Sequence, residues 1–504
     1  MAILVLAIEK PYWQDVMVKA AELGLPITAA VVHYRDTDVP NHFFERYKPK
    51  QIQGKPFYRI EDLSKQLVKD FGTEFPSLDE AVIKAMAPAE RDFYILTDRF
   101  NYFPKSFRYR KRLWRESIRY WLAYFAQNKT TALFHGCTPH NLADYTCFHV
   151  AKYLGIPTLL VGHTMINDYV IVRNDYREVE KIPAGFKPGA INEHLQQSAL
   201  SESKVLKLVV QKNDAKTGAK NVAQDKSKVD LHRALQRVKR AIFKAPKFTA
   251  SLAMNGTFPA TVRRTLKKKN YFDYKSRQKQ HDELAVTPDL AQKYVYFAMH
   301  LQPERTSTPE AEMFEDHLLA VNILAQALPK GWKLYVKENP RQFSKINFIK
   351  GFHQRDVSDY RDILNNPNVQ IISQQIPSKD VIKNAQAVST LSGSVGWEAL
   401  RAGKPVIIFA NAWYAACESA YRVENVEQAK AAIAASQEST PEKVKTNIQR
   451  YLAFIQNRLT IGNMGTNTYL KASNLPYEEI VNKMAERIVK ELGITSLRAK
   501  RSNP

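Results

Sequence analysis

The chain has 504 residues, 44% of them hydrophobic, and a formal net charge of +24. This length suits two or three domains, and the hydrophobic content excludes a chain that is mainly disordered. The three cysteines include no CxxC spacing, which argues against a disulfide framework and against a cysteine zinc site. No apolar run approaches the roughly 20 residues that span a bilayer, so we expect a cytoplasmic protein.

Over the first 175 residues, short apolar runs alternate with helical patterns. The runs predict strands at residues 2–8, 27–33, 93–97, 131–136 and 157–162, and the helical patterns fall at residues 12–23, 106–127 and 141–154. Such alternation is typical of a doubly wound α/β domain, here residues 1–175. The first run is too short for a signal peptide and lacks its basic flank, so we interpret it as a buried strand.

Residues 176–290 contain a strongly basic stretch, and we predict that they form a helical insert. Between Lys204 and Lys279 there are 21 Lys and Arg residues but four acidic residues, so this stretch carries +17 of the net charge. Apolar residues recur at helical spacing around residues 231–243, which indicates a basic amphipathic helix. Three interpretations compete: a solvated insert, a contact with an anionic membrane surface, and nucleic-acid binding. The last is the weakest, because no nucleic-acid motif accompanies the charge.

A second block of alternating elements covers residues 291–475, and a C-terminal helix and tail cover residues 476–504. Its predicted strands lie at residues 294–298, 333–337, 369–373, 387–390 and 405–409, with helices at 310–328, at 379–384 and before the last strand. The sequence therefore predicts an α/β protein with two Rossmann-like, doubly wound domains and a basic helical insert. Ligand loops of such domains gather at the carboxyl ends of the strands.

The most informative segment joins the strand at residues 387–390 to a helix. Ser392, Gly393 and Ser394 lie where this helix begins, so hydroxyl groups and free backbone N–H groups meet at the positive end of its dipole. Glu398 follows one turn later on the same helix face. This pattern predicts a nucleotide site, with phosphate at the helix N-terminus and the carboxylate near ribose hydroxyls. An ordinary capped helix in a parallel sheet is the competing interpretation.

Polar residues follow two further strands of the second block. His300, Gln302 and Glu304 come directly after its first strand, in a turn with more ionisable side chains than ordinary turns contain, which favours a functional site. Lys337 and Asn339 lie at the end of the next strand, where the lysine would place a cation beside a phosphate.

In the first block, His140 and Asp144 lie one helical turn apart, shortly after the strand at residues 131–136. An imidazole that is oriented by a carboxylate can serve as an acid, a base or a phosphate contact. A histidine paired locally at a helix N-terminus is the alternative interpretation.

Together these motifs resemble the bacterial capsule polysaccharide biosynthesis family, which includes relatives of the Kdo transferases of capsule assembly. The matching pieces lie at residues 139–144, 151–156, 300–304, 334–338 and 392–406. The resemblance implies a two-domain B-type glycosyltransferase (GT-B) fold. It also implies transfer of a sugar from a nucleotide-sugar donor to a growing capsular or other surface polysaccharide.

In this family the donor pocket lies in the C-terminal domain. The resemblance therefore implies a nucleotide-sugar site made of His300, Gln302, Lys337, Asn339, Ser392, Gly393, Ser394 and Glu398. Some members use CMP-linked donors and hold the phosphate with a Lys-x-His-Pro motif, in which Asn339 replaces the histidine here. An amide can donate a hydrogen bond to phosphate but cannot become a cation, which weakens the case for a CMP donor.

Glycosyl transfer also needs a group that removes the proton from the acceptor hydroxyl. We expect His140, Asp144 and Glu304 to be the catalytic residues, and we expect neither a metal nor another cofactor. The expected partners are the nucleotide-sugar donor and a lipid-linked or oligosaccharide acceptor. We also expect a peripheral contact with the inner membrane through the basic insert, and no specific nucleic acid.

Two other functions fit the same architecture. Sugar-nucleotide epimerases and hydrolases share it, so the fold alone does not decide the reaction. A non-catalytic glycan-binding component of an export complex is the second alternative.

Overall fold

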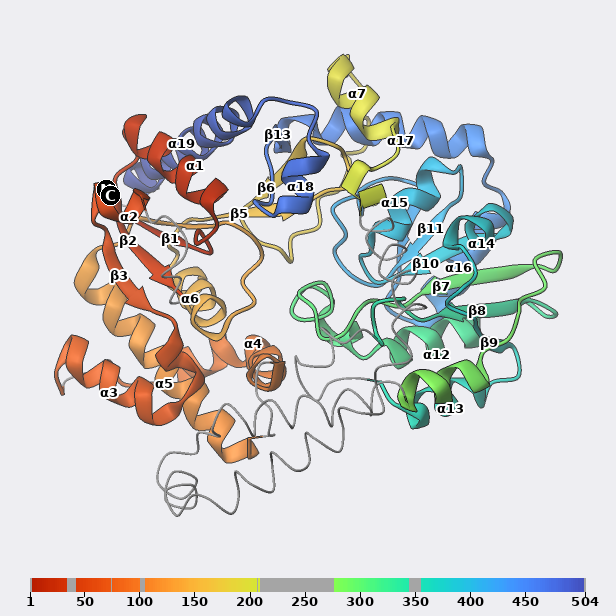
Figure 1. The fold of residues 1–504 in the computed structure, drawn as a ribbon, viewed down its shortest axis with the longest axis horizontal. Coiled ribbons are helices and arrows are strands. Elements are labelled where there is room, and N and C mark those ends of the chain that lie inside the picture. The colour runs from red at the N-terminus through yellow and green to blue at the C-terminus, as the bar shows by residue number, and fades with distance from the viewer. Residues whose placement is uncertain are drawn as a thin grey trace, which may run out of the picture.

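The computed structural model describes residues 2–33, 42–73, 75–99, 105–205, 207–208, 276–343 and 355–502. Within these ranges the chain forms two β-sheets, each flanked by helices (Figure 1). The helix predicted around residues 231–243 and most of the predicted basic insert lie outside the described residues.

The first sheet has seven strands in the order β13-β6-β5-β4-β1-β2-β3. Five of them are parallel to one another: β1 (Ile3–Leu6), β2 (Ile27–Val32), β3 (Lys50–Gln53), β4 (Ala132–His135) and β5 (Thr158–His163). The other two are β6 (Tyr169–Arg173), which is antiparallel to β5, and β13 (Leu459–Ile461), which is antiparallel to β6.

Helices cover both faces of the first sheet, and an apolar core lies under each layer (Figure 1). One layer contains α3 (Ile60–Phe71), α4 (Glu80–Arg99), α5 (Phe107–Asn128) and α6 (Leu142–Tyr153). The other contains α1 (Pro11–Glu22), α2 (His42–Tyr47) and α19 (Tyr477–Ser502). Because both faces are buried, the central strands are continuously apolar rather than alternating.

The second sheet has six strands, all parallel, in the order β12-β11-β10-β7-β8-β9. The strands are β7 (Tyr294–Ala298), β8 (Lys333–Lys337), β9 (Val369–Ile372), β10 (Ala387–Thr390), β11 (Val406–Ile408) and β12 (Ala420–Arg422). The helices on its faces are α12 (His317–Ala327), α13 (Val357–Leu364), α14 (Ser378–Asn384), α15 (Ser394–Arg401), α16 (Val426–Gln437) and α17 (Pro441–Ile455). The predicted fold class, two doubly wound α/β domains, is therefore confirmed.

Each sheet has one point where the strand order reverses. In the first sheet, β1 lies beside β4, and in the second sheet β7 lies beside β10. In open α/β sheets, ligands bind at the carboxyl ends of the strands at such a point, because the loops on either side diverge there. The loops after β1, β4, β7 and β10 are thus where a site is expected.

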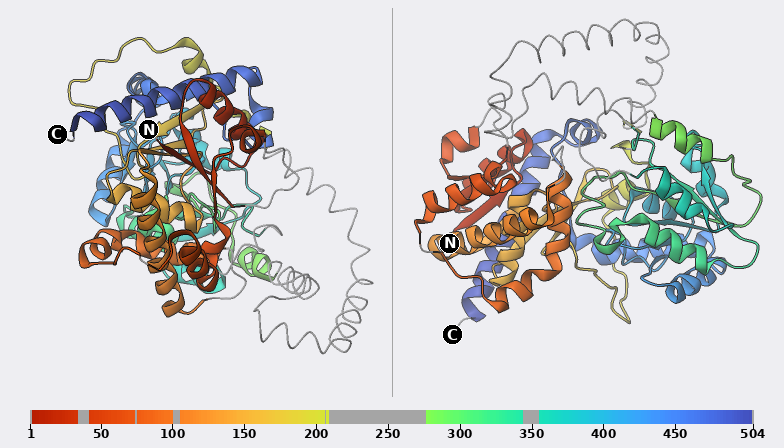
Figure 2. Two further views of the ribbon diagram at one scale, coloured as in Figure 1. Left: turned by 90° about the vertical axis from the view of Figure 1, so that its left-hand side faces the viewer. Right: turned by 90° about the horizontal axis from the view of Figure 1, so that it is seen from below.

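The C-terminal segment returns from the second sheet to the first. After α17, β13 pairs with β6, α18 (Asn467–Ala472) follows, and α19 packs against α1. Both chain ends consequently lie on the side of the first sheet (Figure 2). The domain boundary predicted at residue 475 differs from this arrangement, because β13 belongs to the first sheet.

One predicted strand is wrong. Residues 93–97 lie within the helix α4. Val82, Met86, Ala89, Phe93 and Leu96 are all buried and recur at intervals of three and four, so the short apolar run is part of one helix face. In the part of the chain that the structure describes, no helix is long and apolar enough to cross a membrane.

The core of the first domain is rich in aromatic rings, with Trp121 fully buried between Phe57, Tyr124 and Phe125. We expect Trp121→Ala to lower the free energy of unfolding by about 4 kcal/mol, because the truncation leaves a cavity. The indole N–H is buried and finds no hydrogen-bond partner in the described ranges, so Trp121→Phe should cost much less. Urea and thermal unfolding of the three proteins measure this, and equal losses for both variants would contradict it.

Candidate functional site

The loops after β7 and β10 meet at His300. Its Nε2 lies 2.9 Å from Thr390 Oγ1, and the backbone N–H of Ser392 donates to the same nitrogen at 3.3 Å. A nitrogen that accepts a backbone N–H carries no proton, so His300 is neutral in this arrangement. Burial and the nearby Arg355 guanidinium agree with this, because they lower the pKa of His300 to about 4. His300 therefore fixes the loop rather than supplying a cation.

Gly393 allows this close approach. A Cβ atom at this position would lie 2.9 Å from His300 Nε2 and 2.8 Å from Thr390 Oγ1, too near for any side chain. The hydroxyl of Tyr414 donates to the carbonyl of Gly393 at 2.6 Å. The loop before α15 is thus held from three sides.

The N-terminus of α15 is open. Its N-cap residue is Gly393, which has no side chain to accept from the first backbone N–H groups of the helix. Nearby, the hydroxyl oxygen of Ser392 is buried and has no hydrogen-bond partner in the described chain. An unpartnered hydroxyl beside free helix N–H groups is an arrangement that binds an anion well.

Glu398 lies one turn into α15 and is half-buried. Burial raises the pKa of its carboxyl group to about 7, although a hydrogen bond from Ser394 opposes the shift. The carboxylate also lies close enough to Tyr296 to influence that hydroxyl. Ser394 and Glu398 therefore lie together at the start of the helix, as the sequence predicts.

Lys337, at the end of β8, is buried. Its ammonium group donates to the carbonyl of Ile376 and to Ser378 Oγ, the latter at 3.2 Å, and burial lowers its pKa to about 8. Ser378 Oγ is also 3.3 Å from the hydroxyl of Tyr296, the same tyrosine that lies near Glu398. Hydrogen bonds thus connect Lys337 to Tyr296 through Ser378, and Tyr296 lies near Glu398 of α15.

Gln302 and Asn339 are predicted from the sequence to lie in the nucleotide site. In the structure their side chains form hydrogen bonds with backbone groups. The side chain of Gln302 is buried, donates to the carbonyl of Glu315 at 2.6 Å and accepts from Arg355. Asn339 Oδ1 accepts from the backbone N–H of Arg341 at 3.0 Å and closes a turn. Both side-chain polar groups of Gln302 and the side-chain oxygen of Asn339 are already used by the protein, so both residues help to shape the loops.

Arg355 was missed by the sequence analysis. Two of its nitrogens bind the buried carboxylate of Glu338 at 2.6 and 2.7 Å, and a third hydrogen bond of 2.9 Å reaches the carbonyl of His300. Tyr360 donates to the same carboxylate at 2.6 Å. This buried ion pair connects the end of β8 to the loop after β7, which no local sequence spacing reveals.

In the first domain, Asp144 does not pair with His140 as expected. It is fully buried and lies 2.5 Å from His33 Nε2 and 3.2 Å from His135 Nε2. Burial opposes its charge, but the two imidazoles outweigh that effect and hold the pKa of Asp144 well below its usual value. Burial also works against the charged form of His135, yet Asp144 and Cys137 raise its pKa to about 10. Asp144 therefore orients two histidines and is closed to solvent.

His140 is half-buried beside the end of β4. Its Nδ1 lies 2.8 Å from the carbonyl of Thr138 and 3.8 Å from Cys137 Sγ. Burial disfavours a Cys137 thiolate, but His140 and His135 outweigh it and hold the pKa of the thiol well below its usual value.

Glu9 is a second residue that the sequence analysis missed. It is half-buried just after β1, and its Oε1 accepts the backbone N–H of His33 at 3.2 Å. Burial raises the pKa of this carboxyl group, and the charge of Asp144 adds to the shift. The sequence contains a signal for this residue, because Glu9 directly follows the first predicted strand, where site residues are expected.

The strand ends of the two sheets contact each other. Thr138, after β4, donates to Glu310 Oε1 at 2.5 Å, and Arg305 pairs with the same oxygen at 3.1 Å. Glu304 lies on this loop, half-buried, with the hydroxyl of Thr306 3.5 Å from its carboxylate. The predicted acceptor and donor residues are therefore carried by loops that meet.

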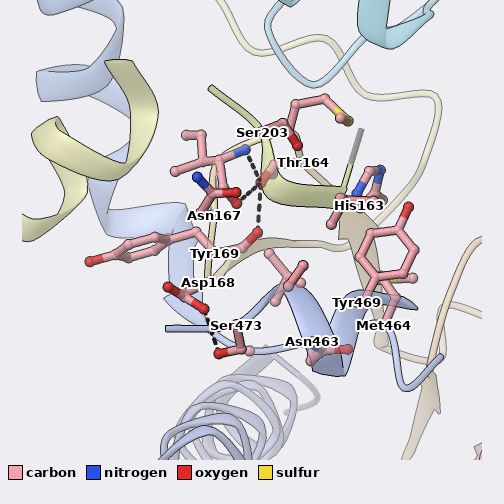
Figure 3. A pocket seen from close by; sticks show the side chains of 16 residues that line it. His163, Thr164, Asn167, Asp168, Tyr169, Ser203, Asn463, Met464, Tyr469 and Ser473 are labelled. Carbon is pink, nitrogen blue, oxygen red and sulfur yellow. Dashed lines mark hydrogen bonds between the residues drawn. The ribbon is translucent and has the colours of Figure 1, made fainter. Parts of the chain in front are cut away.

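A small pocket lies next to this contact, between the β5–β6 turn and the returning C-terminal segment (Figure 3). His163 lies edge-on to Tyr469, with ring centroids 4.7 Å apart, and burial lowers its pKa to about 3. The polar groups at the other end hold the fold together, since Asp168 accepts from Ser473 at 2.5 Å and Thr164 donates to the carbonyl of Tyr169 at 2.6 Å. Among the described residues, no three His, Cys, Asp or Glu side chains are arranged to hold a metal ion.

Comparisons with known proteins bear on this arrangement. The family described as capsule polysaccharide biosynthesis protein matches residues 219–449. No curated protein matches the chain.

Several solved structures are similar at low identity. The glycotransferase of kitacinnamycin is 11% identical, with 94% of this chain and 96% of that chain covered and a TM-score of 0.23. The beta Kdo 2,7 transferase of Thermosulfurimonas dismutans KpsC is 11% identical, with 72% and 88% covered and a TM-score of 0.30. The UDP-GlcNAc 2-epimerase from Methanocaldococcus jannaschii is 12% identical, with 90% and 99% covered and a TM-score of 0.23.

The fold is assigned from the strand order of this chain, and the family resemblance is assigned from the sequence match. The matched segment contains the predicted pieces at residues 300–304, 334–338 and 392–406. The predicted resemblance is thereby confirmed for this segment: residues 219–449 are similar to the capsule polysaccharide biosynthesis family.

Proposed function

We propose that the chain is a glycosyltransferase that moves a sugar from a nucleotide-sugar donor to a growing capsular or other surface polysaccharide. The observation that carries this proposal is the open N-terminus of α15, where the buried hydroxyl of Ser392 has no hydrogen-bond partner among the described residues. The match to the capsule polysaccharide biosynthesis family supports the choice of a glycan as the acceptor.

The donor phosphates would bind at this helix N-terminus. Its free N–H groups and the hydroxyls of Ser392 and Ser394 can donate hydrogen bonds to the departing phosphate and so stabilise its growing negative charge. Lys337 adds a nearby cation when it is protonated. Glu398 is placed to accept hydrogen bonds from ribose hydroxyls when it is ionised. His300 and Gly393 hold the loop in the required shape.

The acceptor would bind on the side of the first sheet. Transfer requires that the acceptor oxygen bonds to the anomeric carbon, loses its proton and displaces the nucleotide phosphate. Asp144 is enclosed, so we assign it to positioning His33. Glu9 is the better candidate to accept the proton, because it is half-buried, has a raised pKa and is held by the backbone of His33. His140 and Glu304 remain candidates for contacts with the acceptor.

A thermal-shift screen with CMP, UDP, GDP and their sugars tests the proposal first. A ligand that binds only the folded state must raise the melting temperature. If none of these ligands raises it at millimolar concentration, the proposed function fails and the export-component alternative is favoured. Turnover of a nucleotide sugar without an acceptor would favour the epimerase or hydrolase instead.

Two substitutions at the start of α15 test the donor site. We expect Ser392→Ala and Glu398→Ala each to weaken binding of the selected nucleotide sugar by roughly 10-fold, because each removes a hydrogen bond to a charged or polar ligand group. Isothermal calorimetry measures the affinity, and thermal unfolding checks the fold. Glu442→Ala, an exposed glutamate on α17, is the matched control and should leave affinity unchanged. Unchanged affinity in both site variants would remove α15 from the site.

Donor affinity should also depend on pH. Glu398, with its pKa raised to about 7, is ionised only above that pH, so affinity should rise between pH 6 and about 7.5. Lys337, with its pKa lowered to about 8, loses its charge above that pH, so affinity should fall again. Calorimetry across pH 6–9 would show a maximum near pH 7.5, about midway between these two values. The acidic limb should disappear in Glu398→Gln, and its persistence there would assign it to another group.

Replacing Glu9 tests the acceptor side. We expect Glu9→Gln to lower the transfer rate by about 100-fold or more, the usual contribution of a general base, while donor affinity stays unchanged. Initial rates at saturating donor, together with calorimetry, separate these effects. Glu22→Gln, a partly exposed glutamate on α1, is the matched control. A Glu9→Gln variant with the full rate would exclude Glu9 as the base.

A further inference from the structure

The helix α5 carries a row of arginines on its outer side. Arg108, Arg112, Arg115 and Arg119 follow one another at intervals of four, three and four residues, so they share one helix face. The first three are exposed, and the opposite face of the helix is buried in the core of the first domain. With a rise of about 1.5 Å per residue, the row extends over about 16 Å.

Few acidic residues balance the positive charge of this row within the same stretch of the helix. Residues 105–119 contain seven Lys or Arg residues and one acid, Glu116, which pairs with Arg119 at 2.7 Å. Arg108, Arg112 and Arg115 form no ion pair with any described residue. Like charges one turn apart destabilise a helix. Arg108, Arg112 and Arg115 are therefore suited to binding an external anion.

An exposed aromatic ring lies at the start of the same helix. Phe107 is 60% exposed, and the ammonium group of Lys111 lies 6.0 Å from its ring centroid. Its inner edge packs against Tyr94, with ring centroids 5.3 Å apart, so the ring is fixed in an outward position. An aromatic ring among cations is typical of segments that bind at the lipid headgroup level.

We propose that α5 docks the first domain on a membrane surface of anionic phospholipids. The arginines would bind the lipid phosphates, for which the planar guanidinium is well suited. Phe107 would enter between the headgroups. An exposed row along one helix face, with an exposed ring at the start of the same helix, suits a flat surface better than a polymer bound in a groove. The residues of this surface lie outside the predicted basic insert in the sequence and in the other domain from the proposed donor site, so the test needs no turnover.

The test compares two variants that lose the same charge. In Arg108→Gln/Arg112→Gln/Arg115→Gln the row is neutralised, whereas Lys383→Gln/Lys443→Gln/Lys445→Gln removes three exposed charges from the second domain. Sedimentation with vesicles of phosphatidylcholine and about one-third phosphatidylglycerol, at about 0.15 M salt, measures the partition coefficient. Since each cation near such a surface contributes roughly fivefold, the row variant should bind roughly 100-fold more weakly than wild type. The control variant should bind nearly as well as wild type.

The aromatic contact has its own matched pair. Phe107→Ser should weaken vesicle binding by roughly 10-fold, because insertion of the ring is lost. Met313→Ser, a substitution of a residue that is 65% exposed on the second domain, should not change it. Thermal unfolding confirms that all variants are folded.

Three results would overturn the proposal. Equal losses in the two triple variants would show an effect of net charge alone. Unchanged vesicle binding in the row variant would show that α5 is not the contact. Tighter binding of a duplex DNA oligonucleotide than of the vesicles, lost in the row variant, would identify a nucleic acid as the partner.

Discussion

The candidate site depends on one hydrogen bond between two loops: the backbone N–H of Ser392 donates to the imidazole of His300. This bond joins the ends of β7 and β10, the two strands at which the order of the second sheet reverses. It requires a neutral imidazole, which burial and the charge of Arg355 ensure. With the loop held in this way, α15 can begin without a side-chain cap, and its N–H groups stay available for a ligand.

The first domain uses the opposite electrostatic arrangement at the equivalent place. There a buried carboxylate, Asp144, lies between His33 and His135 and favours their charged forms. In the second domain the neutral His300 contacts the loop before the open N-terminus of α15. In the first domain Asp144 is buried with two histidines, and the backbone of one of them, His33, binds the half-buried Glu9. The second domain suits the binding of an anion, and the first suits the removal of a proton, which are the two tasks that the proposed sugar transfer requires.

The strands and the start of α15 could be predicted from the sequence, because their signals are local. Continuous apolar runs marked the central strands, and the small residues at 392–394 marked the loop. Residues 93–97 were assigned wrongly, since a short apolar run does not distinguish a strand from one face of a helix.

The partners within the site could not be predicted in this way. His135 contacts Asp144 and Arg355 contacts Glu338 because particular strands and loops are neighbours in the fold. The spacing of residues along the sequence does not reveal the order of strands in a sheet. The pairing of His140 with Asp144 was expected from their separation of one turn. The structure instead places the carboxylate toward the sheet, where it contacts His33, directly after β2, and His135, the last residue of β4.

The antiparallel pairing of β13 with β6 has a consequence for how the chain can be divided. The first sheet takes β1–β6 from the chain before residue 174 and β13 from the chain after Ile455, and every strand of the second sheet lies between them, so the first domain is not a single contiguous stretch. A fragment that stops before Leu459 would leave β6 as an unprotected edge, open to association with other chains. Separate production of the first domain therefore requires that the segment containing β13 be joined to the segment that ends with β6.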